Sequence, residues 1–600
     1  MRWFLMILLS ASALWAQFGE TIVVTAGAFP SPLEEVAPQA TVLTAGELQA
    51  RRIQNVDEAI RETLSAIVLR SGTPGKVSSL FLRGADSDHA LILLNGVPVS
   101  NSSFSGYNYG DILTAGISRI EIVRGPYSAL YGSEAMAGVV SLFTNGGTRD
   151  ALHVSASAGG DGLAEGDASV DEGRLHLTLA RHSEAGRLPN DGWAQSQGIF
   201  FYDAGAWGIS LVGRDGDVGI PLNEGVPSPE RRMRSQEYTM ALPFHFDLME
   251  GWKLEADAGT TWNRLRFTDG QDPYGYTWSD TRAGRAFARV LLEESGQDWK
   301  SAFGLEARRD TVSDRSVYGT NLDGKAMEDG ALFFEETGAV GAMAVRAGLR
   351  LDHHSEFGST LNPKLSLAVP IGKIRLHVQA GTAFRAPSMG ELYFPNSGNG
   401  DLQPEKSVSV EAGVSGGGFT FNAFQSRYTN LIDFNYATYA FQNSGRSRIR
   451  GLEFQTGRTF GKTRLDLSAT WLDTEDFSTG LPLLRRPRLS GSWFLTRPAG
   501  RFTVTASGLY VGRRSDIDAV TFARVGMRPF YRQDLTLAIE DPRLLHPYIK
   551  IENCFNSAYE EIAGYPALGR RVIAGLRWDM DLGKPAVSDQ LSAVNRKTTY

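Results

Sequence analysis

The stretch Arg174–Ser183 reads RLHLTLARHS, and apolar residues alternate with polar ones along most of its length. Leucines occupy every second position from Leu175 to Leu179, with His176 and Thr178 between them. Successive side chains of a β-strand point to opposite faces, so a period of two predicts a strand with one apolar and one polar face.

The same alternation recurs in short runs from Ala151 almost to the end of the chain. Examples are ALHVSASAGG, KIRLHVQAG, RLDLSATW, RFTVTASGLYVG and YIKIENCF. A soluble β-sandwich also alternates, but this tract is far longer than one sandwich domain of about 100 residues. About 430 residues, at about 20 per strand and connection, accommodate about 22 strands. The tract therefore predicts a mostly β fold, a large antiparallel transmembrane β-barrel.

The first residues and the strand ends agree with this interpretation. Met1-Arg2 is followed by an apolar stretch and by small residues, SASALWAQ, which predicts a secretory signal peptide ending near Ala16. The apolar stretch is much shorter than the about 20 residues of a spanning helix. Aromatic residues suited to the interfacial girdles of a barrel lie at strand ends: Trp262, Trp278, Tyr510 and Trp578.

Composition excludes several functions. The net charge of -7 argues against a nucleic-acid partner, which would favour a basic surface. The single cysteine, Cys554, excludes an intrachain disulfide, so the fold depends on hydrogen bonds and packing. The nine histidines are scattered, and the sequence shows no nucleophile–base arrangement, so we do not expect an enzyme.

A smaller α+β domain precedes the barrel. Thr44 and Glu47 form a capping-box pattern at a helix start, and Asn95-Gly96 marks a tight turn between two strands. A barrel of this width encloses an open lumen, which such a domain can fill as a plug. The expected segments are a signal peptide at 1–16, an N-terminal segment at 17–32, the plug at 33–149, the barrel at 150–580 and a polar tail at 581–600.

Motifs in a fixed order carry a resemblance to a known family. They are ETIVVTA, SSLFLRGADSDHALILLNGVPV, ISRIEIVRGPYSALYGSEAMAGVVSLFT, GTAFRAPSMGELYFPNSGNGDLQPEKSVSVEAGV with NSGRSRIRGLEF, and IENCFNSAYEEIAGYPALGRRVIAGLRW. Together they resemble the TonB-dependent outer-membrane receptors across essentially the whole mature chain. The resemblance implies active import of a scarce ligand across the outer membrane, with TonB and outer-membrane lipid as partners and no required cofactor.

Within this family, several stretches look like those of the cobalamin receptors: GKVSSLFLRGADSDHALILLNGV, RYTNLIDF, NSGRSRIRGLE and LPLLRRPR. The resemblance therefore implies cobalamin or a related corrinoid as the ligand. Catecholate-type ferric-siderophore receptors share the same scaffold and stay open as an alternative. A second alternative is a passive plugged porin or an adhesin.

The stretch ETIVVTA resembles the TonB box, which TonB grips. Gly27, Pro30 and Pro32 follow it, so the sequence offers no adjacent hairpin partner. An unpaired strand can donate its edge to another protein through backbone hydrogen bonds. The alternative is that it forms the first strand of the plug. The residues are Glu20, Thr21, Ile22, Val23, Val24, Thr25 and Ala26.

Two arginines end plug strands, Arg83 in FLRG and Arg124 in IVRG. A charge enclosed in a barrel must be paired, and the family resemblance implies pairing with the barrel glutamates Glu411 and Glu453. The alternative is that each arginine bonds to backbone carbonyls or water.

Two plug loops are implied to face the outside and contact ligand. They carry hydroxyls, amides and aromatic rings, which can stack on a flat ligand and bond to its rim. The alternative is ordinary flexible loops. The candidate residues are Ser71, Lys76, Ser102, Phe104, Ser105, Tyr107, Asn108 and Tyr109.

The cobalamin receptors also carry calcium-binding acidic loops early in the barrel. The matching acids here are Asp191, Asp215 and Asp217. Calcium takes six to eight oxygen ligands, and Asp-Gly pairs are common in turns, so these residues serve equally as turn residues.

Overall fold

The computed structural model describes residues 22–33, 40–144, 149–223, 225–435, 437–540 and 545–585. The predicted signal peptide, Glu20, Thr21 and the tail from residue 586 lie outside these residues. None of the helices in the described part of the chain is long and apolar enough to cross a membrane.

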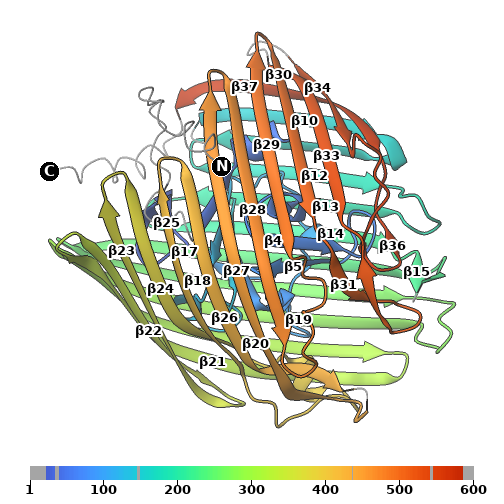
Figure 1. Ribbon diagram of the computed structural model, residues 1–600, viewed down its shortest axis with the longest axis horizontal. Helices are drawn as coiled ribbons and strands as arrows, with labels where there is room; N and C mark the ends of the chain where they lie inside the picture. The colour runs from blue at the N-terminus through green and yellow to red at the C-terminus, as the bar shows by residue number, and fades with distance from the viewer. Residues whose placement is uncertain are drawn as a thin grey trace, which may run out of the picture.

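A closed antiparallel barrel forms most of the molecule and confirms the predicted fold class (Figure 1). Strand β10 pairs with β37 and closes the ring. The 22 strands are β10 (Arg149–Gly159), β11 (Ala164–Glu172), β12 (Leu175–Glu184), β13 (Trp193–Asp203), β14 (Gly208–Gly219), β17 (Arg232–Met249), β18 (Trp252–Thr268), β19 (Trp278–Ser295), β20 (Trp299–Ser316), β21 (Gly319–Val340), β22 (Met343–His354), β23 (Gly358–Ile371), β24 (Ile374–Arg385), β25 (Glu405–Gly416), β26 (Phe419–Asn435), β27 (Ala440–Phe460), β28 (Thr463–Asp476), β29 (Leu489–Ala499), β30 (Phe502–Val511), β33 (Phe530–Ile539), β34 (His546–Glu552) and β37 (Arg571–Pro585).

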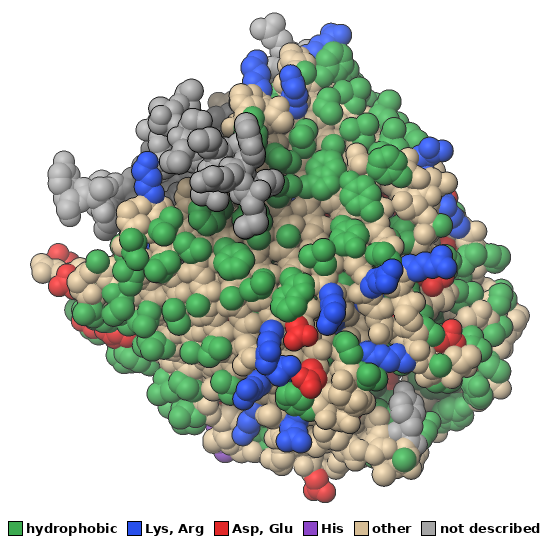
Figure 2. All heavy atoms as spheres, viewed as in Figure 1, with side chains coloured by type: hydrophobic (Ala, Val, Ile, Leu, Met, Phe, Trp, Pro, Cys, Tyr) green, Lys and Arg blue, Asp and Glu red, His purple; other side chains and the backbone are tan. Residues whose placement is uncertain are grey.

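The two sides of a barrel strand follow the alternation in the sequence. On β12, Leu177 and Leu179 are 39% and 62% exposed, whereas His176 and Thr178 are buried toward the lumen. Apolar side chains accordingly cover much of the outer face (Figure 2). Strand β37 continues to Pro585, beyond the barrel end expected at residue 580.

The two ends of the barrel differ in their connections. One end carries mostly tight turns, at residues 173–174, 250–251, 341–342, 372–373, 417–418 and 461–462. The other carries longer loops, at residues 185–192, 220–231, 386–404, 477–488, 512–529 and 553–570. Outer-membrane barrels place short turns in the periplasm and long loops outside, so the tight-turn end is periplasmic. Strand β10 starts and β37 ends there.

Short elements lie within the long loops. They are β15 (Leu222–Asn223), β16 (Val226–Pro227), α5 (Met389–Tyr393), β31 (Arg514–Ile517), β32 (Arg524–Met527), β35 (Glu560–Ile562) and β36 (Tyr565–Pro566).

The plug lies inside the barrel and is drawn mainly in blue in Figure 1. Its five-stranded sheet has the order β3 (Ala40–Thr44), β8 (Arg119–Arg124), β9 (Gly138–Phe143), β6 (Ala90–Leu94) and β7 (Val97–Pro98). A hairpin joins β4 (Ala66–Arg70) to β5 (Ser78–Leu82). The remaining elements are α2 (Ala45–Ala50), α3 (Val56–Arg61), η1 (Ser87–His89), η2 (Tyr109–Asp111), α4 (Ser128–Tyr131) and, after the first barrel strand, η3 (Gly160–Gly162).

Local signals in the plug sequence fold as expected. Thr44 and Glu47 form the reciprocal capping box of α2. Asn95 and Gly96 both have positive φ, 47° and 85°, as a tight turn of this type requires. The plug core continues into the barrel wall, where Phe424 and Leu472 belong to the same buried apolar cluster.

Candidate functional site

The N-terminal segment is paired and folded back into the lumen. Strand β1 (Ile22–Val23) pairs antiparallel with β2 (Ser31–Pro32), so the expectation of an unpaired, exposed strand is wrong for this structure. The chain turns back between β1 and β2 through the loop at residues 24–30. The sequence pattern did not predict this turn, because the two strands are not adjacent in the sequence. Val23 is fully buried.

Hydrogen bonds to a few side chains hold this segment. The Glu121 carboxylate accepts from the backbone of Val24 (3.1 Å) and Thr25 (2.9 Å) and from the Thr25 hydroxyl (2.7 Å). Arg346 donates to the Ala26 carbonyl at 3.0 Å, and Glu335 accepts from the Ala28 N–H at 2.9 Å.

Glu335 and Arg346 flank the turn between β21 and β22, which is a periplasmic turn. The predicted TonB-box segment, as far as the structure describes it, is therefore held inside the barrel near its periplasmic mouth.

Arg83 joins the plug to two barrel strands. Its guanidinium donates to both oxygens of Glu453, at 2.9 and 2.8 Å, and to Glu411. All three side chains are buried. Burial alone lowers the pKa of Arg83, but Glu453 and Glu411 outweigh it and raise that pKa, so Arg83 stays charged.

Arg124 lies in the same region, within the electrostatic influence of Arg83, Glu411 and Glu453. Its Nη1 donates to the Thr41 hydroxyl at 2.7 Å, and its side chain is completely buried. Burial is the main reason why the pKa of Arg124 is lowered to about 10. The positive charge of Arg83 also lowers this pKa, whereas Glu453 opposes the decrease. For Arg83 the structure shows the pairing with Glu411 and Glu453 that the family resemblance implied.

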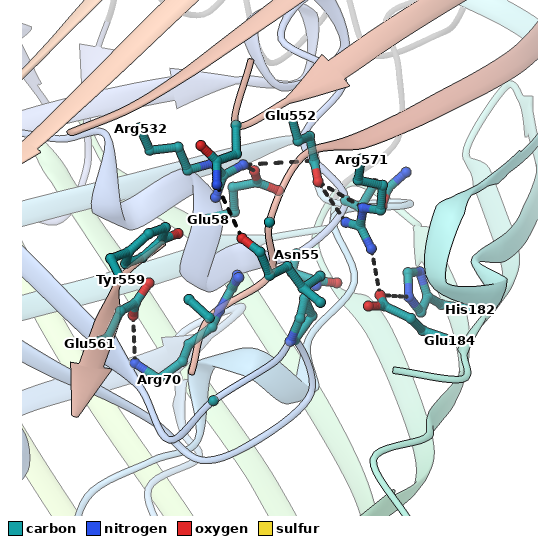
Figure 3. Close-up of a pocket in the computed structure, with 17 residues that line it drawn as sticks. Asn55, Glu58, Arg70, His182, Glu184, Arg532, Glu552, Tyr559, Glu561 and Arg571 are labelled. Carbon is teal, nitrogen blue, oxygen red and sulfur yellow. Dashed lines mark hydrogen bonds and ion pairs between the residues drawn. The ribbon is translucent and has the colours of Figure 1, made fainter. Parts of the chain in front are cut away.

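A second ionic cluster joins the plug to the last barrel strands, and the sequence analysis missed it (Figure 3). Arg61 forms a bidentate ion pair with Glu561, in which its Nη1 and Nη2 donate to the two carboxylate oxygens at 2.9 and 3.1 Å. Arg532 reaches Glu58 on α3 at 3.0 Å, and Arg571 contacts Glu552 at 2.7 Å. The period-two polar positions of β33 and β34 were the signal that could have revealed it.

Among the described residues, one group of acids lies close enough together to suggest a metal site: Glu58, Asp534 and Glu552. Arg532 contacts all three carboxylates, and Lys550 adds contacts to Glu58 and Glu552. Protein cations therefore already neutralise this group.

The predicted ligand residues lie at the outward end of the plug, but several of them form hydrogen bonds with barrel residues. Lys76 donates to the Asp191 carbonyl at 2.7 Å, and the Tyr107 hydroxyl bonds to Arg214. Ser105 accepts from Arg385 at 3.2 Å.

The remaining predicted ligand residues divide into buried and open positions. Ser102 and Tyr109 are buried, and the Asn108 side chain accepts from the Ser78 N–H at 2.9 Å. Ser71 is half-buried, and its N–H bonds to Val77. Phe104 is half exposed and packs against Phe394 of the 386–404 loop with ring centroids 5.5 Å apart. Phe104 is therefore the predicted ligand residue with the most open surface.

The predicted metal residues do not come together. Asp191 is buried, where it accepts from Thr73 at 2.6 Å and from Lys76. Asp215 and Asp217 lie half exposed on β14, paired with arginines of the neighbouring strand β17. Each carboxylate already has a protein partner, so these three residues form no common calcium cage.

A third ionic cluster connects the plug to the loop at 386–404. Arg385 makes paired hydrogen bonds to Glu391 and Glu405, between 2.8 and 3.0 Å. His89 of the plug lies 2.7 Å from the Glu405 carboxylate and stacks on Tyr428. Burial lowers the pKa of His89, but Glu405 outweighs it, so the pKa is raised.

Comparison with protein families gives two matches that divide the chain as the fold does. Residues 170–540 match the family described as TonB dependent receptor-like, beta-barrel. Residues 32–139 match the TonB-dependent Receptor Plug Domain.

Curated relatives match over most of the chain. The vitamin B12 transporter BtuB of Photobacterium profundum is 24% identical over 567 residues, which cover 86% of this chain and 90% of that protein. BtuB of Vibrio cholerae is 25% identical over 599 residues, covering 92% and 94% respectively.

Solved structures share the fold at lower identity. The siderophore receptor PirA from Acinetobacter baumannii has a TM-score of 0.75 and 16% identity, covering 93% of this chain and all of that one. A point mutant of the ferric enterobactin receptor PfeA from Pseudomonas aeruginosa, in complex with enterobactin, has a TM-score of 0.73 and 17% identity, covering 90% of this chain and 99% of that one. The copper transporter OprC gives 0.77 and 17%, covering 90% and 98%.

Proposed function

The chain belongs to the TonB-dependent receptors, which are outer-membrane transporters and not enzymes, and on this premise we propose that it imports cobalamin or a related corrinoid. One observation carries the choice of ligand. Relatives named as vitamin B12 transporters align with 86–92% of the chain. The siderophore, iron and copper proteins share the fold at 14–18% identity, which does not distinguish ligands.

The outward end of the plug suits a large, flat and partly apolar ligand. Phe104 offers an open ring there, and the half-exposed Val77 lies on the neighbouring plug loop. Aromatic faces stack on macrocycles, and polar groups around them can bond to an amide-bearing rim. A corrinoid has both features.

The proposed cycle uses the N-terminal segment as the attachment point for TonB. Ligand binds at the outward end, the plug rearranges, and Ile22–Ala26 leaves the lumen. TonB then adds a strand to this segment and pulls, because backbone hydrogen bonds provide grip whatever the side chains. The hydrogen bonds to Glu121 and Arg346 hold the segment before release. In this proposed cycle TonB, energised from the inner membrane, supplies the pulling force for transport.

Direct binding tests the ligand. Purified protein is titrated with cyanocobalamin and, separately, with ferric enterobactin, each with and without added Ca²⁺. We expect saturable cyanocobalamin binding and none of ferric enterobactin. The reverse result establishes the second candidate, a catecholate siderophore receptor, which the likeness to PfeA supports. Binding of neither compound contradicts both ligand assignments and leaves the transport class intact.

Uptake by living cells tests the attachment point. Val23→Pro removes a backbone donor from the segment, so energised uptake of labelled ligand should fall at least about tenfold while ligand binding is unchanged. Val23→Ala keeps the donor and is the matched control, expected to transport at close to the normal rate. Normal uptake by Val23→Pro would show that TonB does not attach to this segment.

A further inference from the structure

One buried arginine connects several parts of the molecule at its outward end. Arg385 is the last residue of β24 and is 1% exposed. Its guanidinium donates to both oxygens of Glu405 on β25, at 2.8 and 2.9 Å. It also donates to both oxygens of Glu391 on α5, each at 3.0 Å. These bonds fix the 386–404 loop to the two barrel strands that flank it.

Arg385 also reaches the plug at two places. Its Nη1 donates to the Ser105 hydroxyl at 3.2 Å, and its Nε lies 3.3 Å from the Asp88 carboxylate of η1. Ser105 follows Phe104, whose half-exposed ring packs against Phe394 of the 386–404 loop. The candidate ligand ring is therefore next to one plug contact of the arginine and rests on the loop that the arginine holds.

The other plug contact leads directly into strand β6. The short helix η1 ends at His89, whose imidazole lies 2.7 Å from the Glu405 carboxylate. Strand β6 starts at the next residue, Ala90. Glu405 thus contacts both Arg385 and His89, and the position of η1 depends on this buried ionic cluster.

The N-terminal segment packs against the same strand. Leu91 and Leu93 of β6 belong to one buried apolar cluster with Val23 and Ala26. Val23 is fully buried, and both leucines are at most 4% exposed. Four residues of one strand therefore separate His89 from the last of these contacts. A shift of η1 must disturb the packing of the N-terminal segment, because close-packed interiors transmit strain.

We propose that Arg385 is the positioning residue that communicates ligand occupancy at Phe104 to the N-terminal segment. This rests on the proposed function, in which a ligand stacks on that ring. Stacking competes with the contact between Phe104 and Phe394, and coupling requires such a difference in contacts between two states. The 99–108 loop then moves relative to the 386–404 loop, and the bond from Arg385 to Ser105 breaks. The ionic cluster rearranges, η1 shifts, and β6 loosens its packing on the N-terminal segment.

A second buried arginine provides the comparison. Arg214 on β14 is 5% exposed, bonds to Tyr107 of the same plug loop and donates to the Asp111 carbonyl at 3.2 Å. These partners lead to η2, whose Tyr109 belongs to a different apolar cluster from the one that contains Val23. Arg214 therefore holds the same loop through a part of the plug that packs elsewhere.

Hydrogen exchange of the ligand-free protein in detergent tests the role of Arg385. Arg385→Gln holds η1 less firmly, so residues 22–28 should exchange at least about tenfold faster, while the β4–β5 hairpin keeps its protection. Arg385→Lys keeps a cation among the carboxylates and should give a smaller increase. It is also the variant to measure if Arg385→Gln does not fold. Arg214→Gln, the matched control, should change exchange of residues 22–28 less than about twofold.

Cyanocobalamin tests the coupling itself. At saturation it should accelerate exchange of residues 22–28 in the unaltered protein at least about tenfold. Arg385→Lys should bind it within about threefold of the normal affinity, because Arg385 is buried and does not touch the ligand, but should lose most of this acceleration.

Three results would overturn the proposal. They are unchanged exchange of residues 22–28 in both Arg385 variants, equal acceleration in Arg214→Gln, and full acceleration by cyanocobalamin in Arg385→Lys. Failure of the unaltered protein to bind cyanocobalamin would instead contradict the ligand assignment of the proposed function. The ligand-free comparison would then still decide the role of Arg385.

Discussion

The plug core and the N-terminal segment both lie in the lumen, but different interactions hold them. Buried ion pairs tie the core to the wall, as between Arg83 and Glu453 and between Glu58 and Arg532. The segment from Val24 to Ala28 is held mainly by hydrogen bonds from its backbone to side chains, above all to Glu121. The plug core is held by buried charged side chains on both partners, whereas residues 24–28 carry no charged side chain of their own.

This difference indicates how a pull from the periplasm can act. Separating a buried ion pair leaves an unpaired charge in a low-dielectric interior, which costs several kcal/mol, about 3–5. Backbone groups that leave Glu121 can bond to water at the barrel mouth, so the net cost per hydrogen bond is about 1 kcal/mol. The segment should therefore detach well before the core moves.

The largest effect should come from breaking the core attachment. Arg83→Ala leaves Glu411 and Glu453 buried without their cation and should lower the free energy of unfolding by about 3–5 kcal/mol. Denaturant unfolding in detergent measures it. Arg83→Lys keeps the charge but not the fork and should lose less. A double-mutant cycle with Glu411→Ala that shows no coupling would contradict the pairing.

A smaller effect should come from loosening the N-terminal segment. Glu121→Gln weakens the acceptor of three donors, so opening of residues 22–28 should become easier by about 1–3 kcal/mol. Hydrogen exchange of this segment should accelerate accordingly, while exchange in β6 and β9 stays unchanged. Uniform acceleration across the plug would show that segment and core are one cooperative unit.

The outward end of the plug offers a third comparison. Phe104→Ala should weaken binding of the ligand about tenfold, because an exposed stacking surface is lost without disturbing the ion pairs. Val77→Ala, a smaller change on the neighbouring apex loop, should weaken it less. Equilibrium titration measures both, and unchanged binding by Phe104→Ala would place the ligand away from this ring.

The smallest effect concerns pH. Because the pKa of His89 is raised in the folded state, its pairing with Glu405 stabilises the protein fully below the ordinary histidine pKa. That contribution is lost as the pH rises through the raised folded value. The stability of the unaltered protein relative to His89→Gln should therefore fall by about 1 kcal/mol between pH 6 and pH 9. A difference between the two proteins that stays constant over this pH range would contradict the pairing of His89 with Glu405.

Much of the architecture could be predicted from short-range patterns. The alternation in RLHLTLARHS correctly assigned lipid-facing leucines and lumen-facing His176 and Thr178, because a strand has a fixed period of two. The capping box of Thr44 and the turn at Asn95-Gly96 depend on neighbouring residues alone, so they too were readable.

Partner choice was not readable, because it depends on contacts between residues hundreds of positions apart. Only the family resemblance indicated that Arg83 pairs with Glu411 and Glu453, and no pattern indicated that Lys76 pairs with Asp191 or that Glu121 accepts from the N-terminal segment. Many charged residues could have satisfied each of these groups equally well in the sequence. Local periodicity specified which faces are apolar, since that follows from backbone geometry. Only the folded barrel determined which buried charges form pairs. A buried charge requires a partner of opposite sign, but many residues of the sequence meet that requirement.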